Sequence, residues 1–243
     1  HEHRQSMSQS ISVVIPVYNA APYITECIES VLAQTYQPQQ IIVINDGSTD
    51  QSLDKLMPYA QKGLIQLQTR ENRGVSTTLN EAIDLAEGDL IAFLDADDVW
   101  LPHKLQQQLT CLQTNPSLDA CFGYVRQFIS PDLPSAVQAG IHCPPEPQPG
   151  WLKQTMLIYR TAFGKTGLFN TLYHTGDFID WFMRAKEAGL QYDMLPDTVT
   201  LRRLHRSGLA SQPQYQKEFV HILKAALDRR ANHSPTHYGS QKP

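Results

Sequence analysis

Short apolar runs alternate with amphipathic segments along the first half of the chain. The apolar runs suit strands that are buried on both faces, and they lie at 11–17, 41–44, 64–67 and 91–94. Between them, apolar residues recur at offsets of three and four, which predicts helices at 24–32, 53–60, 75–86 and 101–112. Repeated strand–helix units predict an α/β fold with a Rossmann-like, doubly wound, mainly parallel sheet.

The second half of the chain has a less regular pattern. Extended segments are expected at 118–129, 155–159 and 192–201, and helices at about 176–188 and 219–227. Residues 130–150 contain six prolines, so we expect a loop there. The pattern predicts a regular half, 11–115, and a smaller mixed half, 116–232, of the same domain. Residues 1–10 are expected to be a disordered end or a cloning remnant, and residues 233–243 a flexible tail.

The composition is compatible with a soluble globular protein. Of 243 residues, 41% are hydrophobic and 18% are charged, and the formal net charge is −4. No strongly basic region supports nucleic-acid binding, and no apolar run approaches the roughly 20 residues of a transmembrane segment. Peripheral membrane association stays open. The cysteines lack the Cys-x-x-Cys spacing of a zinc or redox site, so we expect reduced thiols and a cytoplasmic location.

An acidic cluster, Asp95, Asp97 and Asp98, follows the apolar run 91–94 directly. In open α/β sheets, ligands bind beyond the carboxyl ends of the strands. Three carboxylates at one place repel one another unless a cation joins them, and Mg²⁺ or Mn²⁺ suits oxygen ligands and also holds phosphates. The alternative is a solvated acidic turn at the start of the next helix.

A second polar segment, Asn45-Asp-Gly-Ser-Thr-Asp50, follows the apolar run 41–44. These residue types also favour a helix N-cap, which is the alternative interpretation. Because the ends of parallel strands share one edge of a sheet, we expect this segment to lie at the same edge as the acidic cluster. One of its carboxylates could then bind a base or a ribose hydroxyl.

Together with two further segments, Val14-Ile-Pro-Val-Tyr-Asn19 and Asn72-Arg-Gly74, these motifs resemble the family 2 glycosyltransferases of the GT-A fold, a nucleotide-diphospho-sugar transferase superfamily. The resemblance runs from Ile11 to about Ala210. It implies a metal-dependent transferase that moves a sugar from a nucleotide-diphosphate sugar, by family habit a UDP-sugar, to an acceptor hydroxyl. It further implies inversion in one displacement and Mn²⁺ or Mg²⁺ as the cofactor. Residues 11–115 would bind the nucleotide sugar and residues 116–232 the acceptor.

The resemblance also implies roles for single residues. Asp46 and the backbone around Pro16 and Tyr18 would contact the base. Asp95 would contact the ribose or nucleotide, and Asp97, the end of the Asp-x-Asp (DXD) motif, would bind the metal. In Leu201–Ser207, His205 would meet the metal or diphosphate, and Arg202 or Arg203 the phosphates. The expected donor-binding set is Pro16, Tyr18, Asn19, Asp46, Asn72, Gly74, Asp95, Ala96, Arg202 and Arg203.

The catalytic base is expected in the helical segment that begins near Gly176. Where the family shows Glu-Asp, this chain has Asp177-Phe178, so the second carboxylate is missing. Transfer to a hydroxyl needs a general base, and Asp177 is our candidate, with Asp180 behind it on the same helix face. In the alternative interpretation, Asp177 caps the helix and Asp180 is polar surface.

Several alternatives remain open at this stage. Without the second carboxylate, the protein could bind a nucleotide sugar and turn it over weakly or not at all. Asp95 after an apolar strand also resembles the nucleophile of haloacid-dehalogenase-type phosphatases. The acceptor (a saccharide, a lipid-linked molecule or another small molecule) has no readable signature. Trp100 and Trp181 adjoin the candidate residues and could line a sugar pocket or belong to the core.

Overall fold

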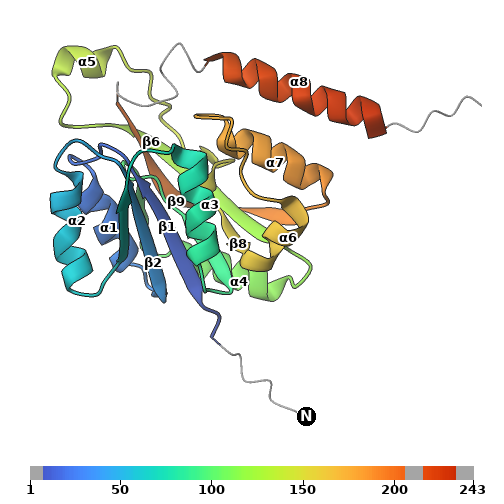
Figure 1. Cartoon of the computed structure of the whole chain (residues 1–243), viewed down its shortest axis with the longest axis horizontal. Coiled ribbons are helices and arrows are strands. Elements are labelled where there is room, and N and C mark those ends of the chain that lie inside the picture. The colour runs from blue at the N-terminus through green and yellow to red at the C-terminus, as the bar shows by residue number, and fades with distance from the viewer. Residues whose placement is uncertain (1–7, 206–215, 234–243) are drawn as a thin grey trace, which may run out of the picture.

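The computed structural model describes residues 8–205 and 216–233. Its centre is one sheet with helices on both faces, as Figure 1 shows. The first four strands of the chain, in the spatial order β3-β2-β1-β4, are parallel. They are β1 (Ile11–Val17), β2 (Gln40–Asp46), β3 (Gln66–Arg70) and β4 (Leu90–Phe93). The predicted α/β class with a mainly parallel sheet is therefore confirmed for this half.

Alternate residues of β1 pack into two separate cores, which explains the double winding. Val13 and Ile15 belong to the core beneath one layer of helices, and Val14 belongs to the core beneath the other. The first layer contains α1 (Ile24–Leu32), α2 (Ser52–Gln61) and α4 (Lys104–Thr114). The second contains α3 (Val75–Leu85), α6 (Phe163–Thr166) and α7 (Asp177–Glu187).

The second half extends the same sheet with mixed strand directions. Strand β8 runs antiparallel to β4, β6 runs antiparallel to β8 and parallel to β9, and β5 runs antiparallel to β9. These strands are β5 (Val99–Trp100), β6 (Ala120–Ile129), β8 (Leu157–Tyr159) and β9 (Tyr192–Leu204). The two predicted halves thus share one sheet, and the second half is mixed, as expected.

Several segments differ from their predicted boundaries, including the third strand, the proline-rich stretch and the helix predicted at 219–227. Strand β3 starts at Gln66, two residues later than expected, because Leu64 still closes the turn after α2 through a hydrogen bond to the carbonyl of Tyr59. The proline-rich stretch contains a short helix, α5 (Ser135–Ala139), and the two-residue β7 (Gln148–Pro149), which pairs with β6. Helix α8 spans Gln216–His233 and is longer than predicted.

Two smaller points concern the ends of the chain and membranes. Ser10, within the expected disordered end, donates hydrogen bonds from its backbone and its hydroxyl to Asp89, whereas residues 1–7 lie outside the described residues. Of the predicted tail, only His233 is described. Across 8–205 and 216–233, no helix has the length and apolar character needed to cross a membrane.

Lys104, the first residue of α4, is buried in the core beneath that helix. Lys104 is fully buried, and its ammonium group lies 4.4 Å from the centre of the Trp100 ring. It donates to Gln108 Oε1 at 2.7 Å and to the carbonyl of Met156 at 3.5 Å. Because no carboxylate among the described residues pairs with it, burial lowers the pKa of Lys104 from 10.5 to about 7.

This burial predicts a specific dependence of stability on pH. Between about pH 7 and 10.5 the unfolded chain binds a proton at Lys104 that the folded chain releases, so the free energy of unfolding should rise with pH. The contribution approaches about 1.4 kcal/mol per pH unit. We expect Lys104→Met to remove this slope in urea unfolding measured at pH 7, 8 and 9, and the exposed control Lys62→Met to keep it. An unchanged slope in Lys104→Met would contradict the assignment.

Candidate active site

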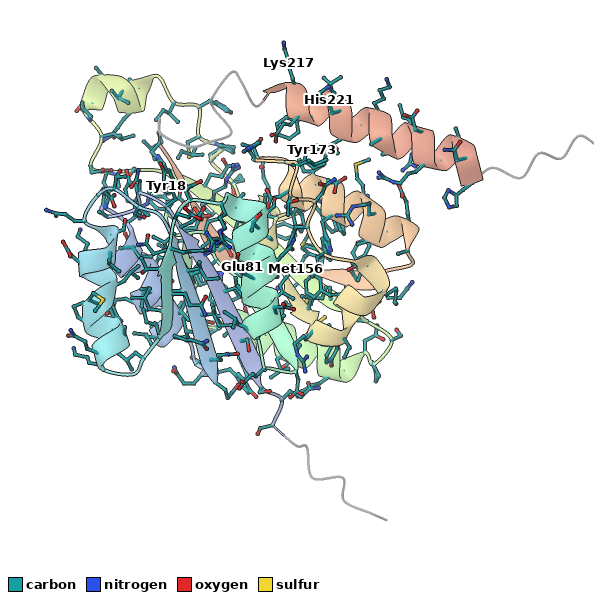
Figure 2. All side chains as sticks on the ribbon, viewed as in Figure 1. Tyr18, Glu81, Met156, Tyr173, Lys217 and His221 are labelled. Atoms are coloured by element: carbon teal, nitrogen blue, oxygen red, sulfur yellow. The ribbon has the colours of Figure 1, made fainter. Side chains whose placement is uncertain are left out.

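The loops after β1 and β2 are bonded to each other at the carboxyl edge of the sheet. Asn19 accepts a hydrogen bond from the Thr49 amide at 2.8 Å, and its own amide donates to Ser48 Oγ at 2.9 Å. Asn19 has φ 47, a conformation that asparagine tolerates better than most residues. Tyr18 lies at the same edge with half of its side-chain surface exposed (Figure 2). Two of the predicted donor-binding residues, Tyr18 and Asn19, therefore lie together at this edge, just after β1.

Asp46 is buried at the end of β2 and holds the turn after β3. Its carboxylate pairs with Arg70 and accepts the amides of Arg73 at 2.8 Å and Gly74 at 3.0 Å. The Asn72 side chain donates to the Asp46 carbonyl at 3.0 Å. The predicted residues Asp46, Asn72 and Gly74 are thus brought together, and a base at this place would meet a preformed turn. Arg70, which was not expected from the sequence, supplies the charge that balances Asp46.

The acidic cluster after β4 is compact. One carboxylate oxygen from each of Asp95, Asp97 and Asp98 lies within 4.8 Å of the others. Asp98 is buried, and it accepts hydrogen bonds from Gln154 Nε2 at 2.9 Å and from the Arg203 amide at 3.0 Å. Burial, together with the charges of Asp97 and Asp95, raises the pKa of Asp98. Asp95 and Asp97 are each about 30% exposed and are the members that an ion could reach.

Two residues of β9 and its end reach the acidic turn. His205 Nε2 lies 2.7 Å from Asp97 Oδ2, so the two predicted metal ligands are adjacent. The buried guanidinium of Arg203 donates to the Asp97 carbonyl at 2.9 Å, to Ser130 Oγ at 3.1 Å and to Glu26 at 2.7 Å. Arg203 therefore holds the acidic turn in place through these acceptors, and the half-buried Arg202 is its neighbour in sequence. Their predicted contacts with phosphates stay predictions.

Lys153 joins the acidic cluster to the candidate base, and the sequence had not indicated it. Its ammonium nitrogen lies 3.2 Å from Asp95 Oδ1 and 3.7 Å from Asp177 Oδ2. Burial alone would lower the pKa of Lys153, but the charges of Asp177 and Asp95 outweigh it and raise that pKa. The lysine is therefore a fixed positive charge. It follows a proline-rich stretch and has no local sequence pattern, so only the tertiary structure reveals it.

Asp177 is the first residue of α7 and is almost fully buried. Among the side chains of the described ranges, its Oδ2 is a buried oxygen that no hydrogen-bond donor reaches. Burial raises the pKa of Asp177, the Lys153 ammonium lowers it, and the charge of Asp95 raises it. Asp180, by contrast, accepts a hydrogen bond from Arg184 Nε at 2.9 Å within the same helix.

Aromatic residues around α7 belong to the core. Phe178 is 7% exposed and packs against Phe122 and Phe182, with ring centroids 6.2 and 5.6 Å away. A carboxylate at this position would be desolvated in an aromatic environment, which costs free energy. Trp100 and Trp181 are buried too, and their indole N–H groups donate to backbone carbonyls at 3.0 Å. The idea that they line a sugar pocket is therefore wrong.

Comparisons with known proteins agree in family and fold. The model of the family "Glycosyl transferase family 2" matches residues 12–182. An uncharacterized glycosyltransferase of Rickettsia prowazekii is 31% identical over 238 residues, which is 89% of this chain and 72% of the relative. The Escherichia coli protein WfgD, a UDP-Glc:alpha-D-GlcNAc-diphosphoundecaprenol beta-1,3-glucosyltransferase, is 34% identical over 105 residues, which is 43% of this chain and 42% of WfgD. The matched family disfavours the phosphatase alternative for Asp95.

Solved structures share the fold. Residues 1–349 of Staphylococcus aureus TarS in complex with UDP-GlcNAc superpose with a TM-score of 0.71 at 19% identity, over 92% of this chain and 67% of that one. The mannosyltransferase PcManGT of Pyrobaculum calidifontis, in complex with GDP-Man and Mn²⁺, gives 0.65 at 19% identity, over 94% and 66%. At this identity the likeness establishes the GT-A fold.

The cluster predicts a metal site that can be tested directly. We expect Asp97→Asn to weaken Mn²⁺ binding at least about tenfold, because it removes an accessible anionic ligand next to His205. Electron paramagnetic resonance of free Mn²⁺ measures this affinity. Asp84→Asn, an equal charge change at an exposed position of α3, should leave the affinity unchanged. Equal Mn²⁺ binding by both variants would remove Asp97 from the site.

Proposed function

Because the chain belongs to glycosyl transferase family 2, we propose that it moves a sugar from a nucleoside-diphosphate sugar to a hydroxyl group of an acceptor. The observation that carries this proposal is the continuous contact from the acidic cluster through Lys153 to Asp177. It joins an oxygen-rich cation site to a buried carboxylate that can accept a proton. The phosphates of a donor would lie at the acidic cluster, and the hydroxyl group of an acceptor would lie at Asp177.

UDP is the nucleotide we favour. The structural neighbour TarS was solved with UDP-GlcNAc and the relative WfgD is named for UDP-Glc, whereas PcManGT holds GDP-Man. Tyr18 and the bonded loops of Asn19 and Asp46 would bind the base, and residues 11–115 would form the donor side. Residues 116–232 would bind the acceptor. WfgD acts on a diphosphoundecaprenol-linked sugar, so a lipid-linked acceptor is one class to test beside saccharides and other small molecules.

The acidic cluster fits a divalent cation. Its three carboxylates lie close enough to share one ion, and carboxylate oxygens suit Mn²⁺ and Mg²⁺. Asp97 and His205 would hold the ion, with Asp95 directed toward the nucleotide. When bound, such an ion supplies positive charge that offsets the charge of a departing nucleoside diphosphate.

Asp177 is our candidate for the general base. Among the described residues its Oδ2 accepts no hydrogen bond, and its neighbour is the Lys153 ammonium 3.7 Å away. This oxygen therefore keeps the capacity to take the proton of an acceptor hydroxyl that is brought to it. Lys153 opposes the effect of burial on the pKa of Asp177 and favours the charged form that a base needs. A single base of this kind fits one displacement with inversion at the sugar carbon. Asp180 forms an ion pair with Arg184, and it is our second candidate for the base after Asp177.

The first test separates catalysis from binding. We expect Asp177→Asn to lower kcat at least about a hundredfold, the usual contribution of a general base, with UDP-sugar affinity retained. Transfer is followed by release of UDP and affinity by calorimetry in the presence of Mn²⁺. Asp54→Asn, at an exposed position of α2, is the matched control. If Asp177→Asn keeps full activity, another group is the base. If the wild type binds the donor but releases no UDP with any acceptor tested, the alternative suggested by Phe178 holds: the protein binds a nucleotide sugar without turning it over.

The second test concerns Lys153. Without its charge the pKa of Asp177 should rise further, because the strongest influence that lowers this pKa is removed while burial and Asp95 remain. The base would be protonated over a wider range, so in Lys153→Met the acidic limb of the profile of kcat/KM against pH should move to higher pH by about one unit or more. Lys153→Arg should restore the wild-type limb, whereas Lys165→Met, which removes an exposed pair with Asp119, should not change it. A loss of activity in Lys153→Met that is equal at all pH values would contradict this role.

The cytoplasmic location suggested by the cysteines stays a prediction. All four thiols are free in the structure, and Cys27 and Cys121 are buried. A reduced compartment suits them.

A further inference from the structure

Helix α8 is fastened to the turn that precedes the candidate base. Glu218 accepts the amides of His174 at 2.9 Å, Thr175 at 3.0 Å and Gly176 at 3.4 Å. Ile222 is buried against Gly176, where an added Cβ would collide with Ile222 Cδ1. The inner face of α8 therefore packs against the residue next to Asp177. Figure 1 shows the helix lying along α7.

A second face of α8 is apolar and exposed. Val220, Leu223 and Leu227 are 65%, 55% and 64% exposed, and their spacing of three and four residues places them in one stripe along the helix. We call these three residues the outer stripe. A surface helix of a globular protein normally carries a single apolar face toward its core, and here Ile222 and Ala226 already form that face. No residue in 8–205 or 216–233 buries the outer stripe, so we expect another partner to cover it.

The charges around the outer stripe are basic. Lys217 and Lys224 are exposed beside it, and Figure 2 shows Lys217 directed away from the sheet, with Tyr173 on the inner side of the helix. Residues 216–233 contain four lysines and arginines against two acidic residues, whereas the whole chain has a formal net charge of −4. Of these basic residues, Arg229 is paired with Glu187, whereas Lys217 and Lys224 are exposed beside the outer stripe and favour an anionic partner.

We propose that the outer stripe docks on the surface of an anionic lipid bilayer. Apolar side chains in one stripe, flanked by lysines, are suited to the boundary of headgroups and acyl chains, because the apolar groups enter and the long lysine side chains reach the phosphates. Since the inner face of α8 holds the turn before Asp177, docking would bring the candidate active site close to the bilayer. The docking itself does not depend on the proposed transfer.

Sedimentation of the full chain with vesicles tests the proposal. We expect the wild type to bind phosphatidylglycerol vesicles at least about tenfold more tightly than phosphatidylcholine vesicles. Binding should weaken at 0.5 M salt, because the Debye length is then only about 4 Å and the attraction between charges is screened. The triple variant V220Q/L223Q/L227Q should lose at least about tenfold of this affinity. K217Q/K224Q, which keeps the stripe, should lose the preference for the anionic lipid. The control M57Q/L64Q alters two exposed apolar residues outside α8, at and just after α2, and should bind like the wild type.

Two results would overturn the proposal. One is a wild type that does not sediment with phosphatidylglycerol, or a triple variant that sediments as the wild type does. The other is a wild type that forms a dimer by light scattering, which the triple variant converts to a monomer, because the occupant of the outer stripe is then a second copy. Circular dichroism of each variant verifies that the helix content is kept, so lost binding reports the surface.

Discussion

The mutual repulsion of three carboxylates at the end of β4 is the constraint around which the site is organised. One carboxylate oxygen from each of Asp95, Asp97 and Asp98 lies within 4.8 Å of the others, so negative charges there repel one another. The side chains that hold this turn, Lys153, Arg203 and His205, all come from the second half of the chain. The regular half therefore supplies the acidic turn, and the mixed half supplies the basic and histidine side chains that contact it. This dependence gives a physical reason for both halves to share one sheet: β5 and β9 must pair for Arg203 to reach the turn.

The candidate donor side depends on a second charge pair, between the buried Asp46 and the half-buried Arg70. Asp46 and Arg70 lie at the ends of neighbouring strands, and removing one member of a buried pair typically costs about 3–5 kcal/mol because the other is left uncompensated. The turns around them are also packed tightly. Gly47 has φ 74, and a Cβ there would lie 2.5 Å from the Asn72 nitrogen, so no other residue fits without a shift. The loops are thus held in place before any ligand arrives, which lowers the entropic cost of binding one.

Local pattern was sufficient for most of the fold and for the acidic edge of the site. Apolar runs and helical spacing identified the parallel strands, and the rule that strand ends share one edge was enough to predict that Asp46 and Asp95–Asp98 lie at the same side of the sheet. Lys153 could not be found in this way, because its role arises from contacts with residues far along the chain on both sides. The choice between pocket and core for Trp181 was open for a related reason: a position next to Asp180 in sequence does not show what a helical side chain packs against, and the indole lies in the core.

The departure at Phe178 is best understood through charge. A second carboxylate beside Asp177 would add repulsion at a site where burial and Asp95 already raise the pKa of Asp177. Phe178 adds no charge and packs against Phe122 and Phe182, which anchors the first turn of α7 from the inside. From the outside, Glu218 and Ile222 hold the preceding turn. Asp177, the candidate base, is therefore positioned from two directions and paired with one cation, Lys153.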